Sequence, residues 1–407
     1  MSNPIDVEGK VVIVGAARTP IGAMGGTLAP LLAEQLAVKG IQAVLKQSGL
    51  DPKLVQYTCM GWVMQDARSP NLAKTAAELA GVPPEVPGTT FHENCASSGA
   101  AVHSLARRIL LGEVEIGIAG GVESMSNVPR YLYQGRVKGQ VYGDYTLVDG
   151  VMGALFDAHA GDKGELMGLM SERLTEKYKV SREEQDDVAF RSHQNALKAW
   201  KEGMFADYVV PVDVRPVDQR RGESLSFAKD EGPKDIARAD FAKPKPYFKK
   251  DGGTITSLNS SSINDAAAAL VLASPKKAKE LGLQPLAVLH GYHNIGVHRE
   301  LMGEGAFKVI PPLLKKAGLD LGAVDFFELN EAFAVVVGAA FHFLEGLKIE
   351  RTNQWGSGIS LGHPVGCTAA RQMVDMVHQL RRRNAKIGVT TRCVGGGMGS
   401  GEVIVAV

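Results

Sequence analysis

The chain has 407 residues, a formal net charge of +1, 45% hydrophobic residues and 22% charged residues. This composition is typical of a soluble globular protein that is long enough for at least two domains of ordinary size. The near-zero net charge gives no electrostatic basis for binding nucleic acid or an anionic membrane, so any anionic ligand must be held by a local site.

Four cysteines are spread through the chain, and no two of them form a Cys-x-x-Cys pair: Cys59, Cys95, Cys367 and Cys393. This spacing argues against a disulfide framework and against a metal site, and free thiols fit a reducing compartment. Residues 1–10 are polar and acidic, unlike a signal peptide, and no run of about 18 apolar residues is present. We therefore expect a cytoplasmic protein without a membrane segment.

The predicted elements begin with a short strand. Residues 11–14 are β-branched, and residues 15–20 have the composition of a turn, as expected for a buried first strand. Apolar residues at helical spacing then predict a helix over residues 31–47 that ends at Gly49. A strand followed by a helix predicts an α/β layered fold.

An internal repeat organises the rest of the chain. Residues 46–55 resemble residues 315–324 at an offset of 269, and residues 115–118 resemble residues 386–389 at an offset of 271. This period is far longer than the roughly 20 to 50 residues of a solenoid repeat. Two matches in the same order indicate two duplicated α/β halves.

Cys95 is the first candidate for chemistry. It lies directly before a helical pattern, where the positive end of the helix dipole would lower the pKa of the thiol. The alternative is a small structural cysteine, because cysteine is among the most buried residue types.

The segment over residues 127–253 differs in character from both halves. Helices are predicted over residues 166–178 and from Ser181 to Lys201, where Ser181 and Glu184 form a capping box. A polar, lysine-rich stretch closes this insertion. It is either a solvated surface or a group of cations for a phosphate-bearing ligand.

Two candidates follow in the second half. Asn330 comes after the strand-like residues 326–329, and the offset of 269 pairs it with Gly61. Its amide could stabilise an oxyanion or simply cap a helix. His363 lies in a Gly-His-Pro turn that opens a helical pattern over residues 369–380. It could serve as a base near neutral pH or as an ordinary hydrogen-bonding histidine.

Cys393 is the last candidate. It falls where a predicted strand over residues 386–391 ends and the glycine loop 395–397 begins, before a terminal strand over residues 402–407. A thiol beside a glycine loop can exchange protons or attack a carbonyl. Such a loop can also be a purely structural turn.

Together these motifs resemble the thiolases, the acyl-CoA C-acyltransferases. The motifs appear in family order: Cys-x-Ser at 95–97, Gly-Gly-Val-Glu-Ser-Met-Ser at 120–126, Asn-Glu-Ala-Phe at 330–333, Gly-His-Pro at 362–364 and Cys-Val-Gly at 393–395. The resemblance covers nearly the whole chain. It implies a five-layered αβαβα fold of two duplicated halves with an inserted loop domain. The implied division is residues 1–126 plus 254–284, residues 127–253, and residues 285–407.

The resemblance also implies roles for the candidate residues. Cys95 would be the nucleophile that carries the acyl group, His363 the base that activates it, and Cys393 the second acid/base. Asn330, through a bound water, would form one oxyanion hole with His363. The backbone N–H groups of Cys95 and Gly395 would form the other.

Further implications concern ligands and assembly. Ser261 matches a serine that lines the coenzyme A tunnel, and Met167 and Met302 fall where the family builds its acyl pocket. The resemblance thus implies acyl-CoA and CoA as substrates, no separate cofactor, a place in fatty acid metabolism such as β-oxidation, and a homodimer or homotetramer.

Four positions depart from the family pattern: Ser98, Leu166, Glu304 and Trp355. Because Leu166 and Glu304 are expected in the acyl pocket, they suggest a substrate other than plain acetoacetyl-CoA. Two alternatives to a catalytic thiolase are open. A decarboxylating ketosynthase has a histidine where this chain has Asn330. A non-catalytic thiolase-like subunit that binds acyl-CoA for a partner would not need all four candidate side chains.

Overall fold

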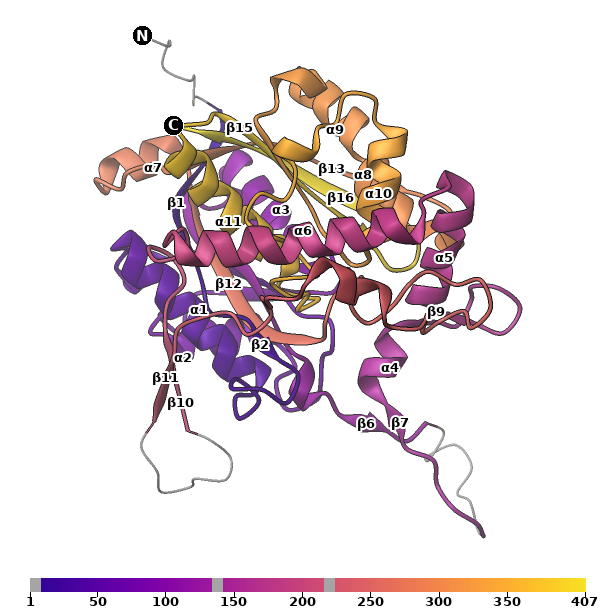
Figure 1. The fold of residues 1–407 in the computed structure, drawn as a ribbon. Coiled ribbons are helices and arrows are strands. Elements are labelled where there is room, and N and C mark those ends of the chain that lie inside the picture. The colour runs from indigo at the N-terminus through magenta and orange to yellow at the C-terminus, as the bar shows by residue number, and fades with distance from the viewer. Residues whose placement is uncertain (1–8, 134–141, 216–223) are drawn as a thin grey trace.

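The computed structural model describes residues 9–133, 142–215 and 224–407 (Figure 1). In these ranges ten strands form one mixed sheet, with β2 (Gly22–Ala23) beside β12. The other nine lie in this spatial order: β14 (Phe326–Leu329), β15 (Ile387–Val394), β16 (Met398–Ala406), β13 (Ala287–Gly296), β1 (Val11–Arg18), β12 (Asn264–Ala273), β5 (Ile116–Ser124), β3 (Thr58–Gly61) and β4 (Gly88–Phe91).

The sheet is symmetric about its middle. β1 and β13 pair antiparallel through residues 11–13 and 287–289. Outward from this pair, β12 corresponds to β16, β5 to β15, and β3 to β14. The outer pairs β3·β5 and β14·β15 are both parallel. The strands thus follow the order that the internal repeat predicts.

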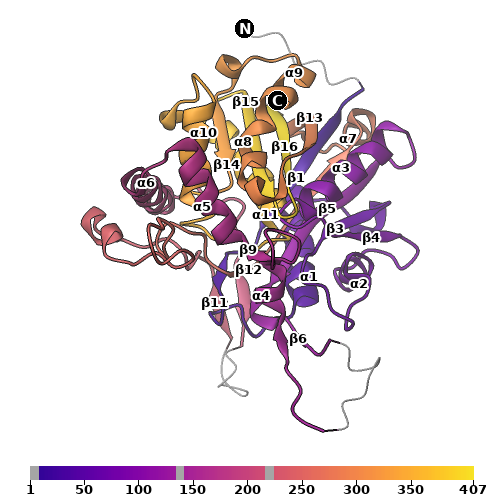
Figure 2. The same ribbon diagram turned by 90° about the vertical axis from the view of Figure 1, so that its right-hand side faces the viewer.

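Helices separate the sheet into layers (Figure 2). α3 (Ser97–Leu110) and α11 (Thr368–Arg383) pack against each other between the two halves of the sheet. On the outer face of the first half lie α1 (Ala33–Ser48) and α2 (Leu72–Leu79). On the outer face of the second half lie α8 (Gly305–Lys308), α9 (Ile310–Ala317) and α10 (Ala334–Phe343). The result is the predicted αβαβα arrangement.

The residues of β12 show how one strand serves two layers. Because successive side chains of a strand point to opposite faces, alternate residues of β12 enter different cores. The central core receives Ala266, Ala268, Leu270 and Leu272, and the outer core receives Ala267, Ala269, Val271 and Ala273. A strand buried on both faces is apolar throughout.

Local signals place most element ends where the sequence predicts them. α1 ends at Gly49, which has the left-handed φ of 70° expected of a C-terminal glycine. α6 (Arg182–Lys201) begins with the Ser181–Glu184 capping box. The predicted turn over residues 15–20 is wrong in part, because β1 continues to Arg18 through a bulge between Ile13 and Gly15.

The segment between the halves carries the remaining elements. Its helices are α4 (Gly150–Ala154), α5 (Met167–Tyr178) and α6, and its two-stranded ribbons are β6 (Arg130–Tyr131) with β7 (Val148–Asp149), β8 (Phe156–Asp157) with β9 (Glu165–Leu166), and β10 (Val212–Val214) with β11 (Leu225–Phe227). α7 (Pro275–Glu280) follows β12.

Residues 1–8, 134–141 and 216–223, which the predictions for the N-terminus and the insertion include, lie outside the described residues. Across the described ranges, no helix is long and apolar enough to cross a membrane.

Candidate active site

A small cavity lies where the N-terminal end of α3, the end of β15 and the inserted segment meet. Its volume is about 50 Å³. The predicted residues that line it are Cys95, Met167, Ser261, Met302, His363 and Cys393, and the other lining residues are Val63, Met64, Asn94, Ala154, Leu155, Ala332, Phe333 and Val365. Cys95 and Cys393, which lie 298 residues apart in sequence, 393 − 95, therefore line one cavity.

A tight turn before α3 presents Cys95. Asn94 has a left-handed φ of 45°, and its side-chain amide donates a hydrogen bond of 2.8 Å to the carbonyl of Gly395. Ser97 Oγ donates to the Asn94 carbonyl at 2.7 Å and accepts from the Glu93 N–H at 2.9 Å. These bonds join the start of α3 to the glycine loop after β15. Cys95 is therefore held at the loop that also follows Cys393.

The thiol of Cys95 is less acidic than its place before a helix predicts. Burial raises its pKa to about 11, although hydrogen bonds from the backbone N–H groups of Gly395 and of Cys95 itself favour the thiolate. The predicted lowering of the pKa is wrong because the desolvation of a buried thiolate outweighs the helix terminus. The two N–H groups are the pair that the sequence resemblance places in an oxyanion hole.

Gly395 lies close to the cavity lining. A Cβ added there would lie 2.4 Å from Met167 Cε, the end of a flexible side chain that lines the cavity, so a larger residue would displace Met167. The absence of a side chain thus lets the loop approach both Cys95 and the cavity.

A buried turn fixes His363. Gly362 has a φ of 118°, and a Cβ there would lie 2.6 Å from the side chain of Asn264. The N–H of His363 donates to Asn264 Oδ1 at 2.9 Å. The side chain of Asn264 therefore packs against Gly362 and fixes the backbone at His363.

Thr368, at the first turn of α11, orients the ring of His363. The Thr368 hydroxyl donates its one proton to the Pro364 carbonyl at 2.9 Å, and Thr368 Oγ1 lies 2.6 Å from His363 Nδ1. Nδ1 must then carry the proton and donate it to Thr368. This arrangement leaves the lone pair of Nε2 free to accept a proton. Sequence reasoning missed Thr368, although its position five residues after the histidine in a turn was a usable signal.

The ring of His363 is neutral at physiological pH. Burial, with a contribution from the nearby Arg371, lowers its pKa to about 3. The pKa is lowered chiefly because the ring is enclosed, so a role for His363 as a base depends on the neutral ring. A neutral imidazole still accepts a proton when a thiol beside it must be ionised.

Asn330 lies beside the histidine at the end of β14. Its Nδ2 is 3.4 Å from each ring nitrogen of His363. Asn330 Oδ1 is buried and has no hydrogen-bond partner among the described residues. A buried carbonyl oxygen without a partner is unusual and indicates a place for a water or a substrate group. Gly358 makes room for it, since a Cβ there would lie 2.8 Å from Asn330 Oδ1.

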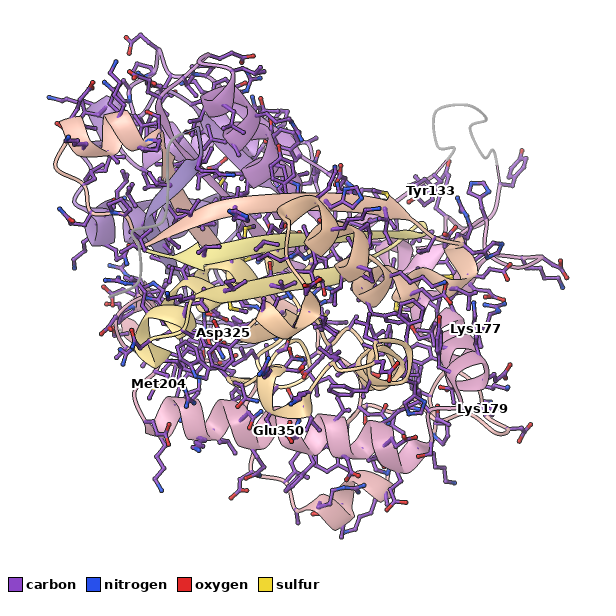
Figure 3. All side chains as sticks on the ribbon, turned by 90° about the horizontal axis from the view of Figure 1, so that it is seen from above. Tyr133, Lys177, Lys179, Met204, Asp325 and Glu350 are labelled. Carbon is purple, nitrogen blue, oxygen red and sulfur yellow. The ribbon has the colours of Figure 1, made fainter. Side chains whose placement is uncertain are left out.

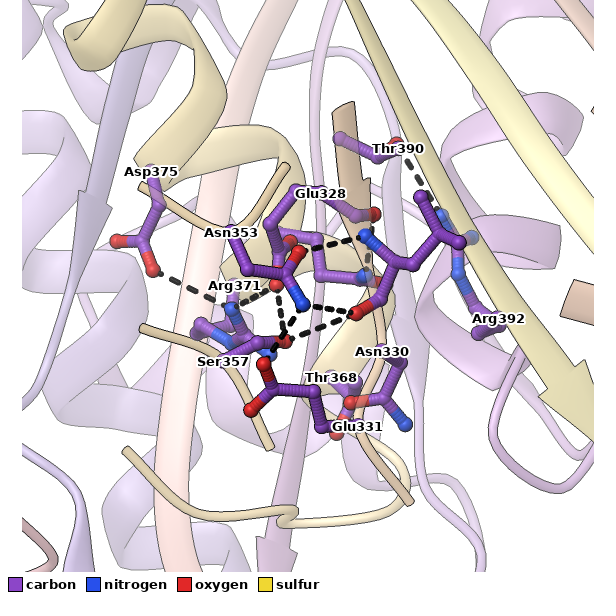
Figure 4. Close-up of polar contacts among 12 residues, drawn as sticks. Glu328, Asn330, Glu331, Asn353, Ser357, Thr368, Arg371, Asp375, Thr390 and Arg392 are labelled. Carbon is purple, nitrogen blue, oxygen red and sulfur yellow. Dashed lines mark hydrogen bonds and ion pairs between the residues drawn. The ribbon is translucent and has the colours of Figure 1, made fainter. Parts of the chain in front are cut away.

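The residues on both sides of Asn330 are held by Asn353, which sequence reasoning did not single out (Figure 4). Asn353 has a left-handed φ of 51° and is buried. Its side-chain amide accepts from the Leu329 N–H and donates to the Leu329 carbonyl, both at 2.9 Å. It also donates to Glu331 Oε1 at 2.8 Å. The strand exit that carries Asn330 is therefore fixed on both of its neighbours.

Cys393 faces the same cavity from β15. The strand runs three residues further than its predicted end at residue 391 and includes Cys393, because pairing with β16 continues to Val394. Burial and the neighbouring thiolate of Cys95 raise the pKa of Cys393 well above its ordinary value. Because each ionised thiol would oppose the other, the two cysteines are not ionised at the same time.

Two of the departures from the family pattern lie outside the cavity lining. The carboxylate of Glu304 is buried and bound by Lys177 Nζ and Lys308 Nζ, each at 2.6 Å, and by the Tyr178 hydroxyl at 2.7 Å. Lys177 projects from the last turn of α5 at the side of the molecule (Figure 3). Leu166 belongs to the β8·β9 ribbon. Contrary to the expectation for the acyl pocket, Leu166 and Glu304 do not line this cavity, whereas Met167 and Met302 do.

The other two departures have packing roles. Ser98 Oγ accepts a hydrogen bond of 3.0 Å from the Ala370 N–H and so ties α3 to α11. Trp355 is buried in the central core, with its ring 5.7 Å from that of Phe205. Of the lysines in the insertion, Lys243 pairs with Asp240 and Lys249 with Glu176.

The duplicated αβαβα fold and a cavity with two cysteines, a histidine and an adjacent asparagine define a class of acyl-transferring enzymes. Models of the thiolase N-terminal domain and the thiolase C-terminal domain match residues 11–276 and 283–406. The chain belongs to the thiolase family and is an acyltransferase of the kind that cleaves a 3-oxoacyl-CoA with CoA or performs the reverse Claisen condensation.

Relatives and solved structures agree with this assignment. The chain is 42% identical to an acetyl-CoA acetyltransferase of Chromobacterium violaceum over 393 residues, which cover 96% of this chain and 98% of that protein. The crystal structure of the Bacillus anthracis acetyl-CoA acetyltransferase has a TM-score of 0.93 at 42% identity and covers 98% of this chain and 99% of that one. Human mitochondrial 3-ketoacyl-CoA thiolase in complex with CoA has a TM-score of 0.91 at 34% identity, with 98% of each chain covered.

Proposed function

We propose that this thiolase transfers a short acyl group between CoA and an acetyl-CoA enolate through a thioester on Cys95. The observation that carries the proposal is the meeting of Cys95, His363 and Cys393 in one apolar cavity. No pair of these side chains could perform the reaction alone, since C–C cleavage needs a nucleophile, a base for it and a proton for the departing carbanion.

In the cleavage direction, His363 Nε2 takes the proton of Cys95, and the thiolate attacks the 3-oxo carbon. The C–C bond breaks with its electron pair on the leaving acetyl-CoA carbanion, which takes a proton from Cys393. Cys393 then takes the proton of the CoA thiol, and the CoA thiolate attacks the thioester. The acyl group leaves as acyl-CoA, and Cys95 recovers its proton from His363. Condensation runs through the same steps in reverse. Neither direction requires a metal or a separate cofactor.

Negative charge develops on two oxygens, and each has donors in reach. The N–H groups of Cys95 and Gly395, which bond the Cys95 sulfur, would hold the oxygen of the thioester intermediate. His363 and Asn330, the latter through a water at its unpartnered Oδ1, would hold the enolate oxygen of acetyl-CoA. One such donor is typically worth about 3 to 4 kcal/mol of barrier.

The size of the cavity supports a short acyl group. About 50 Å³ lined by Met64, Met167 and Met302 leaves room for few carbon atoms beyond the thioester. The relatives named as acetyl-CoA acetyltransferases support the same choice. The hypothesis of a substrate other than acetoacetyl-CoA loses its strongest support, since Leu166 and Glu304 do not line the cavity. Ser261 would contact the pantetheine arm of CoA. A homodimer or homotetramer is expected, and sedimentation would establish which.

An acylation experiment tests the proposal. The protein is incubated with acetyl-CoA, and its intact mass is measured after rapid acid quenching. We expect an acetyl adduct that maps to Cys95 and disappears in Cys95→Ala. Cys367→Ala is the matched control, because Cys367 is equally buried but lies in the central core, and it should acylate normally. An adduct of full size in Cys95→Ala would overturn the proposal.

A further inference from the structure

The residue before Cys95 has a backbone conformation that most residue types avoid. Asn94 has a left-handed φ of 45°, and three other non-glycine residues in the described ranges are also left-handed: Lys179, Asn353 and Asn384. Lys179 and Asn384 end the helices α5 and α11, and Asn353 fixes the exit of β14. A conformation of this kind often marks a functional position. Asn94 is the one of the four that lines the cavity.

The side chain of Asn94 bridges the two halves of the molecule. An asparagine just before a helix commonly accepts a hydrogen bond from a backbone N–H of the first turn. The amide of Asn94 is used as a donor instead, and its Nδ2 donates to the carbonyl of Gly395 at 2.8 Å. These two residues are 301 positions apart in the chain. The start of α3 is therefore joined to the glycine loop at the wall of the cavity.

Asn94 is connected to both N–H groups of the proposed oxyanion hole. The N–H of Cys95 belongs to the peptide group between Asn94 and Cys95. The carbonyl of the same group accepts from the Ser97 hydroxyl at 2.7 Å and from the Ser97 N–H at 3.0 Å, and a planar peptide then has a fixed N–H direction. The second N–H is that of Gly395, the residue whose carbonyl binds the Asn94 side chain. One donor is thus joined to Asn94 by a covalent bond and the other by a hydrogen bond.

The glycine loop depends on other elements for its conformation. Residues 395–397 are all glycine, and Gly396 and Gly397 have left-handed φ values of 88° and 91°. Such a run has many conformations available to it. A Cβ at Gly396 would meet nothing within 4 Å, so packing does not fix the middle of the loop. The carbonyl of Gly397 accepts from the Val297 N–H at 2.8 Å, and the carbonyl of Gly395 accepts from Asn94.

The apolar contact at Gly395 cannot replace the hydrogen bond from Asn94. Met167 Cε lies so close that a Cβ at Gly395 would be 2.4 Å from it. A methionine side chain is flexible and adapts to its neighbours. A hydrogen bond of 2.8 Å, in contrast, is directional. Asn94 is therefore the contact that orients Gly395 at the cavity.

We propose that Asn94 is a positioning residue for acyl transfer: its amide holds the N–H of Gly395 beside the N–H of Cys95, at the spacing that binds the oxygen of an acyl group on Cys95. This role rests on the proposed thioester at Cys95. The two N–H groups touch the oxygen, whereas Asn94 acts through the residues that carry them.

Two rates measured on one thiol test this role. Acetyl-CoA transfers its acetyl group to the Cys95 sulfur and releases CoA, through an intermediate whose oxygen is negatively charged. Iodoacetamide alkylates the same sulfur with loss of iodide and forms no oxyanion. Rapid quenching, intact mass and peptide mapping give both rates at the same pH. Because a change in thiol ionisation enters both rates, the ratio of acylation to alkylation reports on the oxyanion hole.

Two variants remove the amide donor. Asn94→Gly still allows the left-handed backbone. We expect its ratio of acylation to alkylation to be about 10-fold to 100-fold below that of the wild type, because removing one oxyanion donor commonly costs about 100-fold or more. Asn94→Asp keeps the size of the side chain but has no N–H for the Gly395 carbonyl. Its ratio should fall at least as far, and it decides the matter if the glycine variant does not fold.

Asn384→Gly is the matched control. Asn384 has a φ of 50° and is exposed at the end of α11, away from the cavity. The same substitution in the same backbone conformation should leave the ratio at the wild-type value. A wild-type ratio in either folded Asn94 variant would overturn the positioning role alone. Absence of acetylation at Cys95 in the wild type would overturn the proposed function and this role together, so the two failures are distinguishable.

Discussion

The two halves share one strand order but place different residues at equivalent positions. The end of β3 is Gly61 and the position after β14 is Asn330, separated by the repeat offset of 269, 330 − 61. At Gly61 a Cβ would lie 2.2 Å from the backbone nitrogen of Ser98. In the first half, the start of α3, and hence Cys95, therefore packs directly against the end of the strand. In the second half, the equivalent position carries the side-chain amide of Asn330.

The next strand shows the same divergence. With the offset of 271, Val122 on β5 corresponds to Cys393 on β15, and Cys95 corresponds to Gly366 before α11. Val122 is packed in the outer core of the first half, whereas Cys393 faces the cavity. The symmetric fold therefore brings two strand exits and two helix starts together, and the chemistry arises because their residues differ.

The largest loss of activity is expected when Asn330 of the second half is replaced by glycine, the residue at the equivalent position of the first half. Asn330→Gly should lower kcat about 100-fold to 1,000-fold with little change in KM, because it removes the proposed water-mediated donor to the enolate oxygen. Steady-state kinetics of acetoacetyl-CoA thiolysis measures this effect. The melting temperature should change little if the role of Asn330 is chemical.

The converse change separates chemistry from packing. Gly61→Ala should prevent stable folding, because the added Cβ meets backbone atoms of α3 that cannot move away. A soluble, fully active Gly61→Ala protein, or an Asn330→Gly protein with unchanged kcat, would contradict the assignment of these equivalent positions to different tasks.

A smaller effect, on stability and its pH dependence, is expected from Glu123, the buried carboxylate at the end of β5. It accepts hydrogen bonds from the N–H groups of Val63, Met64 and Gly366, at 2.8 to 3.2 Å. It thus ties cavity-lining loops from both halves to one strand. Burial raises its pKa from 4.5 to about 7. Its counterpart at the offset of 271 is Val394, which carries no charge.

The sign of the pH effect follows from this raised pKa. The folded state binds the Glu123 proton more tightly than the unfolded state, so Glu123 contributes most stability below about pH 4.5 and loses it as the pH rises to about 7. The loss is about 3 kcal/mol at most. Glu123→Gln cannot ionise, so its melting temperature relative to the wild type should rise between pH 5 and pH 8. A difference that does not change with pH would contradict a proton on Glu123.

Much of this architecture could be predicted from sequence. The strand over residues 326–329, the Gly49 helix end and the Ser181 capping box depend on neighbours in the chain, and all three are confirmed. The repeat predicted the corresponding positions of Gly61 and Asn330, because duplicated halves conserve the spacing between strands.

The electrostatics of the site could not be predicted in the same way. The predicted lowering of the Cys95 pKa was wrong, and the low pKa of His363 was not predicted, because sequence position shows a helix terminus or a turn but not the depth of burial, which here dominates. Glu304 was misplaced because its three partners come from two different helices. Asn353 and Thr368 act through contacts that become visible only once the turns around them are folded.

The smallest loss of activity is expected from replacing Thr368. This residue is one of the differences between the start of α11 and the start of α3. Thr368→Val keeps the shape of the side chain but removes the acceptor for His363 Nδ1–H, so the histidine can adopt the tautomer with its proton on Nε2. Loss of one such hydrogen bond costs about 1 to 1.5 kcal/mol, or about a ten-fold fall in kcat. KM and the melting temperature should stay near the wild-type values. Thr368→Ser restores the hydroxyl and should recover most of kcat, whereas equal kcat in the valine and serine variants would show that Thr368 does not set the tautomer.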